Sequence, residues 1–497
     1  MKKIQRILLA TPPYHAGVLE SAGIWAPLGL VYIAGELRRH GYDVEIYDSM
    51  SLQHTLDDVR EYLRSKKYDV IGLSSITASI VATLEMLKIS REEHPDAVTV
   101  LGNVHATFEY KNLFEKFSDR IDFIVRGEGE VTMPNLINAL NNSDDIHTVA
   151  GIVFQKENQI ITTRGRKFVE DLNTLEPAWD LLDWKLYKFF VMPHSRMGII
   201  NSSRGCPHTC SFCSQQKFWQ RSYRELTPER FVGQLRHLRD TYGVNVVMIS
   251  DEYPTKNKER WETILDMLIA EETNVALLLE TRVEDILRDE AILWKYRKAQ
   301  IHHIYVGVEA TNQTSLDIFK KDIRCEQSQE ALGLIAANGM ISECSFVLGM
   351  PDETHETIAT TLELAKHYNP DFAHFLAITP WPYSDLYDEL QQYVRDEDYS
   401  HYNLITPIIE PKGMTIEEVN QAIIQCYKEY YIWKVPQFTT DPNPFRKNYL
   451  IRSTRLMMKN SFLQKLMQGS SMPKEVEEML NKKTKCPYTR LKNAVGF

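Results

Sequence analysis

Three closely spaced cysteines stand near the middle of the chain, at Cys206, Cys210 and Cys213. Three thiolates in one short loop can bind three irons of a 4Fe–4S cubane and leave the fourth iron open. An open iron lets a cluster bind and reduce a small molecule as well as pass electrons. Gly205 allows a sharp turn into this loop. The spacing therefore predicts a 4Fe–4S cluster with an exchangeable site.

The alternative for this loop is a structural zinc site completed by His208. Structural zinc sites usually join two separated ligand hairpins, whereas these cysteines form one short run, so the cluster is favoured. The chain has seven cysteines, a small and odd number, which suits a reducing, cytoplasmic setting better than a disulfide framework. We interpret the remaining cysteines as scattered core or surface residues: Cys325, Cys344, Cys426 and Cys486.

Composition places the chain among globular proteins. Its 497 residues allow roughly three domains, and 43% hydrophobic with 25% charged residues is ordinary. A net charge of −10 argues against nucleic acid as a partner. No apolar stretch approaches the ~20 residues that a membrane span needs, and Pro12-Pro13 ends the short apolar start without a cleavage signal.

The cysteine loop follows the first strand of a series in which strands alternate with helices. This pattern predicts a partial (βα)6 barrel over residues 199–383, with functional residues where the strands end. The strand candidates are Ile199–Ser203, Val244–Ser250, Val275–Glu280, Ile304–Val308, Cys344–Leu348 and Phe372–Ile378. Residues 384–497 have a helical pattern with basic segments at Arg446–Lys459 and Lys482–Lys492.

Residues 1–145 also alternate strands with helices, which predicts an α/β domain with a doubly wound, Rossmann-like parallel sheet. Its strand candidates are Ile4–Ala10, Asp43–Tyr47, Val70–Ser74, Val98–Gly102 and Ile121–Arg126. Its helix candidates include Leu28–His40, Leu56–Ser65, Ile80–Glu93 and Val131–Asn141. Ligands bind such sheets beyond the carboxyl ends of the strands. Between this domain and the barrel, residues 146–198 read as a hairpin followed by a connector.

The loop C-x3-C-x-Phe-C after the first barrel strand resembles that of the radical S-adenosylmethionine (SAM) superfamily. The turn Gly349–Thr354 is similar to one that follows the fifth strand in that family. The resemblance implies that the open iron chelates SAM and that electron transfer yields a 5′-deoxyadenosyl radical. It also implies SAM contacts at Phe212, Asp251, Glu252, Thr281, Arg282 and Glu309. Taken singly, each acidic residue of this set could equally be a helix cap or a salt-bridge partner.

A doubly wound sheet ahead of such a barrel resembles the cobalamin-binding subclass of this superfamily. The turns Gly102-x-x-His105-Ala-Thr107 and Arg126-Gly127-Glu128-Gly129-Glu130 are similar to turns of that subclass. The implied cobalamin contacts are Tyr14, His15, Ser74, Gly102, His105, Gly127 and Glu128. The Asp-x-His-x-x-Gly signature of histidine ligation is missing from the first loop, and Asp145-Ile-His147 is a displaced near match. We therefore expect base-off cobalamin without a histidine ligand. His15 and His105 could equally be capping or packing residues, and a dinucleotide site is disfavoured because no G-x-G-x-x-G follows the first strand.

The similarity narrows to the anaerobic magnesium-protoporphyrin IX monomethyl ester oxidative cyclases over roughly residues 1–435. It is carried by strings such as Lys217-Phe218-Trp219, Asp251-Glu252-x-Pro254-Thr255 and Thr379-Pro380-Trp381-Pro382. It implies formation of the isocyclic ring of chlorophyll from a propionate methyl ester arm, with oxygen from water. The implied partners are a tetrapyrrole substrate and an electron donor such as ferredoxin or flavodoxin. The chain departs from the family pattern at Gln216 and Tyr253, two positions expected beside the SAM and substrate space.

A flat tetrapyrrole needs a wide apolar slot with charged anchors. Phe218, Trp219, Trp381 and Tyr383, with the basic segment 446–459, are candidate lining residues; core packing and a solvated helix face are the alternatives. Two other functions remain open, a cobalamin-dependent methyltransferase acting on another substrate and a non-catalytic porphyrin or haem chaperone. A chaperone would not need a corrinoid domain, and the sequence assigns no catalytic residue.

Overall fold

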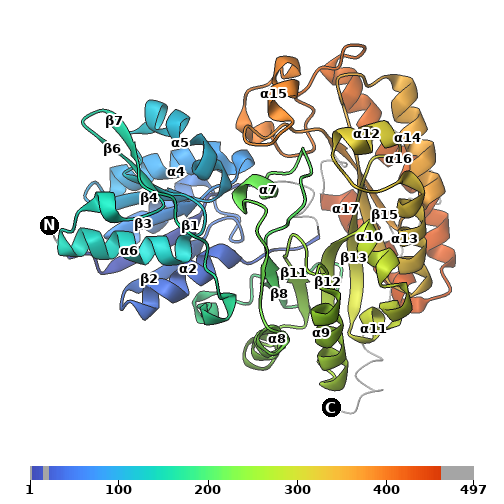
Figure 1. Cartoon of the computed structure of the whole chain (residues 1–497), viewed down its shortest axis with the longest axis horizontal. Helices are drawn as coiled ribbons and strands as arrows, with labels where there is room; N and C mark the ends of the chain where they lie inside the picture. Colours follow the sequence, from blue (N-terminus) through green and yellow to red (C-terminus); the bar gives the residue numbers. More distant parts are fainter. Residues whose placement is uncertain (1–2, 15–21, 461–497) are drawn as a thin grey trace.

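The computed structural model describes residues 3–14 and 22–460. Two large sheets lie side by side, one built from the amino-terminal third of the chain and the other from its middle (Figure 1). The first has seven strands in the order β2-β1-β3-β4-β5-β6-β7, and the second has six in the order β15-β14-β13-β12-β11-β8. The predicted α/β class and the two successive βα units are confirmed.

The first sheet contains five parallel strands, as predicted, and two of its strands match the predicted bounds. The parallel strands are β1 Arg6–Thr11, β2 Asp43–Asp48, β3 Val70–Ser74, β4 Val98–Gly102 and β5 Phe123–Val125. The predicted hairpin forms β6 Ile152–Lys156 and β7 Gln159–Thr162. Since β6 pairs antiparallel with β5, the hairpin extends this sheet beyond its parallel part.

Alternation along the strands gives the first sheet two apolar faces, as a doubly wound sheet requires. In β1, Leu8 belongs to the core beneath three helices, whereas Ile7 and Leu9 belong to the core beneath the other two. The first face packs against α3 Leu56–Ser65, α4 Ile80–Glu93 and α5 Val104–Phe117, and the second against α2 Leu28–Arg39 and α6 Gly129–Asn142. Helix α5 starts inside the segment expected to be a turn, so His105 lies in its first turn.

The second sheet pairs its strands in parallel and in chain order, with β8 and β15 at its two edges, as a partial (βα)6 barrel requires. Its strands are β8 Met197–Ile200, β11 Val246–Ile249, β12 Ala276–Arg282, β13 Ile301–Glu309, β14 Ile341–Leu348 and β15 Phe372–Ala377. Its helices are α8 Pro228–Tyr242, α9 Lys258–Ala270, α10 Val283–Arg288, α11 Leu293–Lys298, α12 Gln313–Ile318, α13 Cys325–Ala337 and α14 His355–Tyr368. A two-stranded ladder, β9 Ser203–Arg204 with β10 Arg224–Glu225, and the short helix α7 Gln215–Phe218 flank the cysteine loop.

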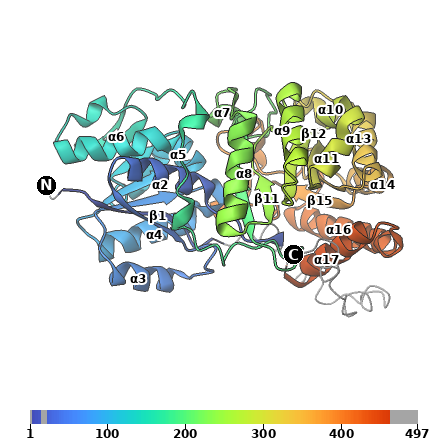
Figure 2. The same ribbon diagram turned by 90° about the horizontal axis from the view of Figure 1, so that it is seen from below.

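Beyond the barrel lie α15 Tyr387–Leu390, α16 Ile416–Thr440 and α17 Pro444–Asn460, so the predicted helical character holds for the described part of this region. Helices α16 and α17 pack beside one another under the barrel (Figure 2). Arg446, in α17, donates to Asp371 and Met340, which immediately precede β15 and β14. Arg446, at the start of the basic segment 446–459, thus lies at the amino ends of the strands, and it does not line the cavity described below. The segment Lys482–Lys492 lies outside the described residues.

Among the described helices, none combines the length and the apolar character that crossing a membrane requires.

Candidate active site between the two sheets

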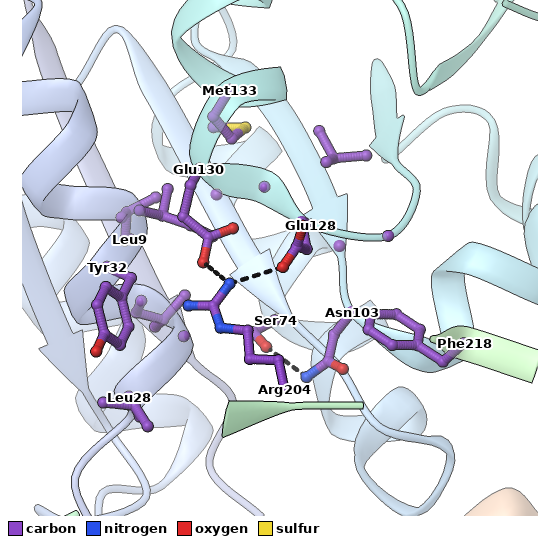
Figure 3. Close-up of a pocket in the computed structure, with 18 of the residues that line it drawn as sticks. Leu9, Leu28, Tyr32, Ser74, Asn103, Glu128, Glu130, Met133, Arg204 and Phe218 are labelled. Atoms are coloured by element: carbon purple, nitrogen blue, oxygen red, sulfur yellow. Dashed lines mark hydrogen bonds and ion pairs between the residues drawn. The ribbon is translucent and has the colours of Figure 1, made fainter. Parts of the chain in front are cut away.

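The carboxyl ends of both sheets border one cavity of about 250 Å³, here called the interdomain cavity. Figure 3 shows Leu9 and Ser74 of the first sheet on one side of it, with Arg204 and Phe218 from the barrel half of the chain. From the first sheet it is lined by, among others, Leu9, Gly72, Ser74, Gly102, Gly127 and Glu128. From the barrel side it is lined by Asn201, Ser203, Arg204, Phe218, Trp219, Ser250 and Glu252. Four of the residues expected to contact cobalamin therefore line one cavity together.

Glycines give the first-sheet side of the cavity room for a ligand. Gly127 has a φ of +71°, and a Cβ added there would meet no heavy atom within 4 Å. At Gly102 the nearest atom to such a Cβ is 3.8 Å away, and Gly29 is also open. Asn103, at φ 80°, donates from its amide to Ser74 Oγ over 2.9 Å and fixes the loop beside them. These open glycines at strand ends fit the close approach of a large cofactor.

The other residues expected on the cobalamin side lie elsewhere. Tyr14 is in the loop after β1 and does not line the cavity, and His15 lies outside the described residues. His105 is only 2% exposed; its Nδ1 is 3.1 Å from Thr77 Oγ1, and its ring lies edge-on to Tyr399 at 5.0 Å. Burial lowers the pKa of His105 to about 3. This imidazole is neutral and covered by Tyr399.

Tyr399 belongs to a segment, residues 381–402, that we call the carboxyl-terminal strap. Tyr383 of the strap lies 2.7 Å from Thr77 through the two hydroxyl oxygens and stacks on Phe108. Three residues later along the strap, Leu386 donates its N–H to the carbonyl of Ser211, in the cysteine loop. The strap thus touches both sides of the site, and Tyr383, at 5% exposure, serves in packing between them.

The cysteine loop holds its three thiols in a largely buried setting. Burial raises the pKa of Cys206, and it raises the pKa of Cys213 to about 12. Thiolates in this loop therefore need positive charge beside them, and bound iron supplies it. Arg282 Nη1 lies 3.8 Å from Cys210 Sγ, and its Nη2 is buried without a hydrogen-bond partner among the described residues. This arrangement fits a cluster whose sulfurs receive N–H donors.

Contacts from outside the loop fix its path. Gly205 has a φ of +91°, and a Cβ there would lie 2.2 Å from the carbonyl oxygen of Ser222, so only glycine fits. Gln216 donates its amide to Cys210 O over 3.1 Å and to Asp385 over 3.0 Å. Gln216 was expected beside the SAM and substrate space. Its side chain instead binds Cys210 and Asp385 and so supports the cysteine loop.

The structural zinc alternative finds no support in the geometry. Within residues 3–14 and 22–460, no three His, Cys, Asp or Glu side chains converge on a point where a single metal ion could be held. A cubane instead distributes its three cysteine ligands over three separate irons.

Two neighbouring acids end β11, and they differ in role. Asp251 is 2% exposed, and its two oxygens accept from Ser202 N, Ser202 Oγ and Ser203 Oγ, each at 2.6 Å. Burial raises the pKa of Asp251 to about 6 despite these donors. Glu252 lines the cavity and accepts from Trp219 Nε1 at 2.7 Å and from Gly205 N at 3.0 Å. Asp251 thus braces the strand end, while Glu252 joins the cavity wall to the cysteine loop.

The remaining residues expected to contact SAM lie around the barrel mouth. Thr281 shares a hydroxyl hydrogen bond with Thr255 at 2.6 Å. Glu309 pairs with Lys321 at 2.9 Å. Phe212 lies edge-on to Phe319 at 5.2 Å. Each of these side chains already has a protein partner.

Glu280, on β12, lies beside the expected SAM contacts Thr281 and Arg282, at a strand end where the resemblance implies contacts to SAM. Its side chain is exposed, and no hydrogen bond to it is found among the described residues. Two effects raise the pKa of Glu280 to about 7: the surrounding barrel desolvates its carboxylate, and the carboxylates of Glu343, Glu252 and Glu309 lie nearby. A carboxylate crowded by acids is stabilised by a cation. In the sequence it is a single acid following four apolar residues in the strand ALLLETR.

Comparison with known proteins agrees with this arrangement. Residues 14–137 match the B12 binding domain, and residues 200–365 match the radical SAM superfamily. The anaerobic magnesium-protoporphyrin IX monomethyl ester cyclase of Rubrivivax gelatinosus is 37% identical, over 93% of this chain and 83% of its own. The cyclase of the same name from Cereibacter sphaeroides is 35% identical, over 91% of this chain and 75% of its own.

A solved structure shares the fold. The cobalamin-dependent SAM radical enzyme OxsB, with aqua-cobalamin and SAM bound, superimposes with a TM-score of 0.69 at 17% identity, covering 99% of this chain and 76% of its own. The matched domains and the cyclase relatives together identify the cofactors as cobalamin, a 4Fe–4S cluster and SAM. The chain belongs to the cobalamin-binding radical SAM family, alongside the anaerobic magnesium-protoporphyrin IX monomethyl ester cyclases.

Proposed function

We propose that this chain catalyses the oxygen-independent oxidative cyclisation of magnesium-protoporphyrin IX monomethyl ester, which forms the isocyclic ring of chlorophyll precursors. The observation that carries the proposal is the interdomain cavity, where glycine loops of the B12 binding domain face the wall that supports the cysteine loop. Substantial identity to two cyclases over most of the chain supports the substrate. When bound, cluster and SAM supply a 5′-deoxyadenosyl radical able to take hydrogen from an unactivated carbon.

The residues of this chain have distinct parts in the proposal. Cys206, Cys210 and Cys213 hold the cluster. Glu280 accepts the ammonium group of SAM, because its carboxylate has no hydrogen-bond or ion-pair partner among the described residues, unlike the strand-end acids Asp251, Glu252 and Glu309. Nη2 of Arg282 has no hydrogen-bond partner among the described residues. It is placed to donate to the carboxylate of SAM, since guanidinium and carboxylate groups match in geometry. We assign residues 1–145 to the corrinoid domain, 146–198 to the hairpin and connector, 199–383 to the barrel and 384–497 to the helical region; residues 1–2, 15–21 and 461–497 of these ranges lie outside the described residues.

The test is an anaerobic reaction containing SAM, cobalamin, reductant and magnesium-protoporphyrin IX monomethyl ester. The expected product is a protochlorophyllide, and deuterium placed on the propionate methylene should appear in 5′-deoxyadenosine, because hydrogen abstraction from that carbon begins the chemistry. A methylated product with the label retained would instead identify a methyltransferase. Tight porphyrin binding without turnover would identify a chaperone, and either result would refute the cyclase.

The electron donor of the proposed reaction is a ferredoxin or flavodoxin, because the cluster must be reduced before SAM is cleaved. We place the reaction in the cytoplasm, where reduced thiols persist. Adding either donor with its reductase should replace chemical reductant in the assay.

Cobalamin in this chain is expected to be base-off, with no protein imidazole on cobalt. His105 is neutral, only 2% exposed and covered by Tyr399, so its nitrogen does not reach the cavity. The measurement is the cobalt(II) electron paramagnetic resonance (EPR) spectrum of the full-length protein, which should lack nitrogen splitting from a histidine. His105→Ala should leave this spectrum unchanged, with His147→Ala as a matched exposed control. Nitrogen splitting that disappears in a histidine variant would contradict the prediction.

A further inference from the structure

Four charged side chains form a buried set between the corrinoid domain and the barrel, and we call it the charge clamp. Arg204 lies 2.8 Å from Glu128 Oε1 and 2.7 Å from Glu130 Oε1. Arg224 lies 3.0 Å from both oxygens of Glu128. Figure 3 shows the Arg204 guanidinium reaching between the two glutamates at the cavity wall. Arg204 and Arg224 follow Glu128 by 76 and 96 residues in the chain, so the clamp joins distant segments.

The clamp is electrically balanced, with two guanidinium groups facing two carboxylates. Their side chains are only 4–12% exposed. Burial alone would lower the pKa of Arg204, but the carboxylates of Glu130 and Glu128 outweigh it and raise that pKa. Tyr32 lies under the same guanidinium at 4.9 Å. Arg204 therefore stays charged between the two carboxylates, whereas Nε and Nη2 of Arg224 are buried without a hydrogen-bond partner among the described residues.

The barrel half of the clamp is built into the approach to the cluster. Arg204 immediately precedes Gly205 and Cys206, and its strand β9 pairs with β10, which carries Arg224. The Arg224 guanidinium lies 5.5 Å from the ring of Trp219, whose indole donates to Glu252. Glu252 in turn accepts from Gly205 N. A displacement of Arg204 would therefore move the first residue of the cysteine loop.

The corrinoid half of the clamp is built into the cofactor cradle. Glu128 and Glu130 flank Gly129, directly after the open Gly127, and all four residues line the interdomain cavity. Glu128 is also anchored from its own side by Val169 N at 2.8 Å. The family resemblance implied that Glu128 contacts cobalamin. Its two carboxylate oxygens instead accept hydrogen bonds from Arg204, Arg224 and Val169 N.

We propose that Arg204 is a positioning residue that holds the corrinoid cradle and the cluster loop at one fixed separation. Buried ion pairs contribute little net stability. Their hydrogen bonds are directional, whereas apolar contacts allow two surfaces to shift, so an ion pair of this kind fixes the relative position of the groups it joins. Fixed geometry matters in this enzyme, since a misplacement of about 1 Å can cost roughly 100-fold in rate. The inference concerns the two resident cofactors and does not depend on the tetrapyrrole substrate.

The test measures the magnetic interaction between cobalt(II) and the reduced cluster in full-length protein loaded with both cofactors and without substrate. This interaction falls steeply with separation, so one separation gives one sharply defined EPR coupling. Arg204→Met should spread the coupling over a range of values. Arg204→Lys keeps the positive charge but cannot bind two carboxylates through parallel N–H groups, so it should restore the single sharp coupling only in part. Product formation by the Arg204→Met protein should fall roughly 10- to 100-fold.

Cobalamin and iron content are measured first, so that only fully loaded protein is compared. Arg236→Met is the matched control, because Arg236 pairs with Glu271 on the exposed surface away from the cavity, and it should keep the sharp coupling. If Arg204→Met does not fold, Glu130→Gln decides the matter, since it leaves Glu128 to pair with both arginines. A sharp coupling in loaded Arg204→Met or Glu130→Gln protein would overturn the proposal and leave the clamp a purely structural feature.

Discussion

Alanine in place of Cys206, Cys210 or Cys213 is expected to remove the 4Fe–4S cluster and with it all cleavage of SAM. Each cysteine supplies one of only three protein ligands, and none of the other cysteines lies in this loop. Anaerobically reconstituted protein should contain about four irons and four sulfides per chain. Each single variant should lose most of this iron and form no 5′-deoxyadenosine.

The matched control for these variants is Cys325→Ala. Cys325 is partly buried like Cys206 and Cys213, but it stands at the start of α13, outside the loop. This variant should keep full iron content and SAM cleavage. A triple alanine variant that still formed 5′-deoxyadenosine would refute the cluster assignment, and one equivalent of tightly bound zinc in the native protein would favour a structural metal site.

Glu280→Gln is expected to weaken SAM binding roughly 10- to 100-fold while leaving the cluster in place. A hydrogen bond to a charged group contributes about 1.5–3 kcal/mol, and each 1.4 kcal/mol is tenfold in affinity. Bound SAM would bring its ammonium to a carboxylate whose pKa is raised by desolvation and by the nearby acids Glu343, Glu252 and Glu309. The measurement is the SAM concentration dependence of the EPR change at the reduced cluster.

Asp251→Asn is the contrasting variant, because the two carboxylates differ in their partners. Asp251 accepts three hydrogen bonds from Ser202 and Ser203, so its replacement should lower the free energy of unfolding by about 1–3 kcal/mol. SAM affinity of the folded protein should change little. If Asp251→Asn weakened SAM binding more than Glu280→Gln did, the assignment of the ammonium contact to Glu280 would be wrong.

Much of the fold could be predicted from the sequence because the strands are short, apolar and bounded by turn residues. The strand Val70–Ser74 and the helix Ile80–Glu93 have the predicted bounds. Ser and Thr residues between them mark the change from the two-residue period of a strand to the 3.6-residue period of a helix. The start of α5 was not predictable in the same way. Asn103 takes a positive φ and caps the helix itself, so a segment that resembles a binding turn becomes helix at Val104.

The site residues were less predictable because their partners are distant in the chain. Asp251 has the position expected of a SAM ligand, but Ser202 and Ser203, 49 and 48 residues earlier, occupy its oxygens. Glu128 is likewise occupied by Arg204, 76 residues later. A sequence pattern places a carboxylate at a strand end, but it does not say which cation or hydroxyl has already satisfied it. For the same reason the sequence does not distinguish Glu280 from the other strand-end acids, since its lack of a partner among the described residues is a property of the folded barrel.

The carboxyl-terminal strap gives the molecule an order of assembly. Thr77 and Tyr383, which meet at its contact with the corrinoid domain, are 306 residues apart in the chain. At a synthesis rate of about 5–20 residues per second, Tyr383 follows Thr77 from the ribosome by roughly 15–60 s. During that interval the corrinoid domain has its own two cores but lacks the covering of Tyr383 and Tyr399. A growing chain therefore exposes Thr77, His105 and Phe108 until the strap arrives, so this face of the corrinoid domain is completed last.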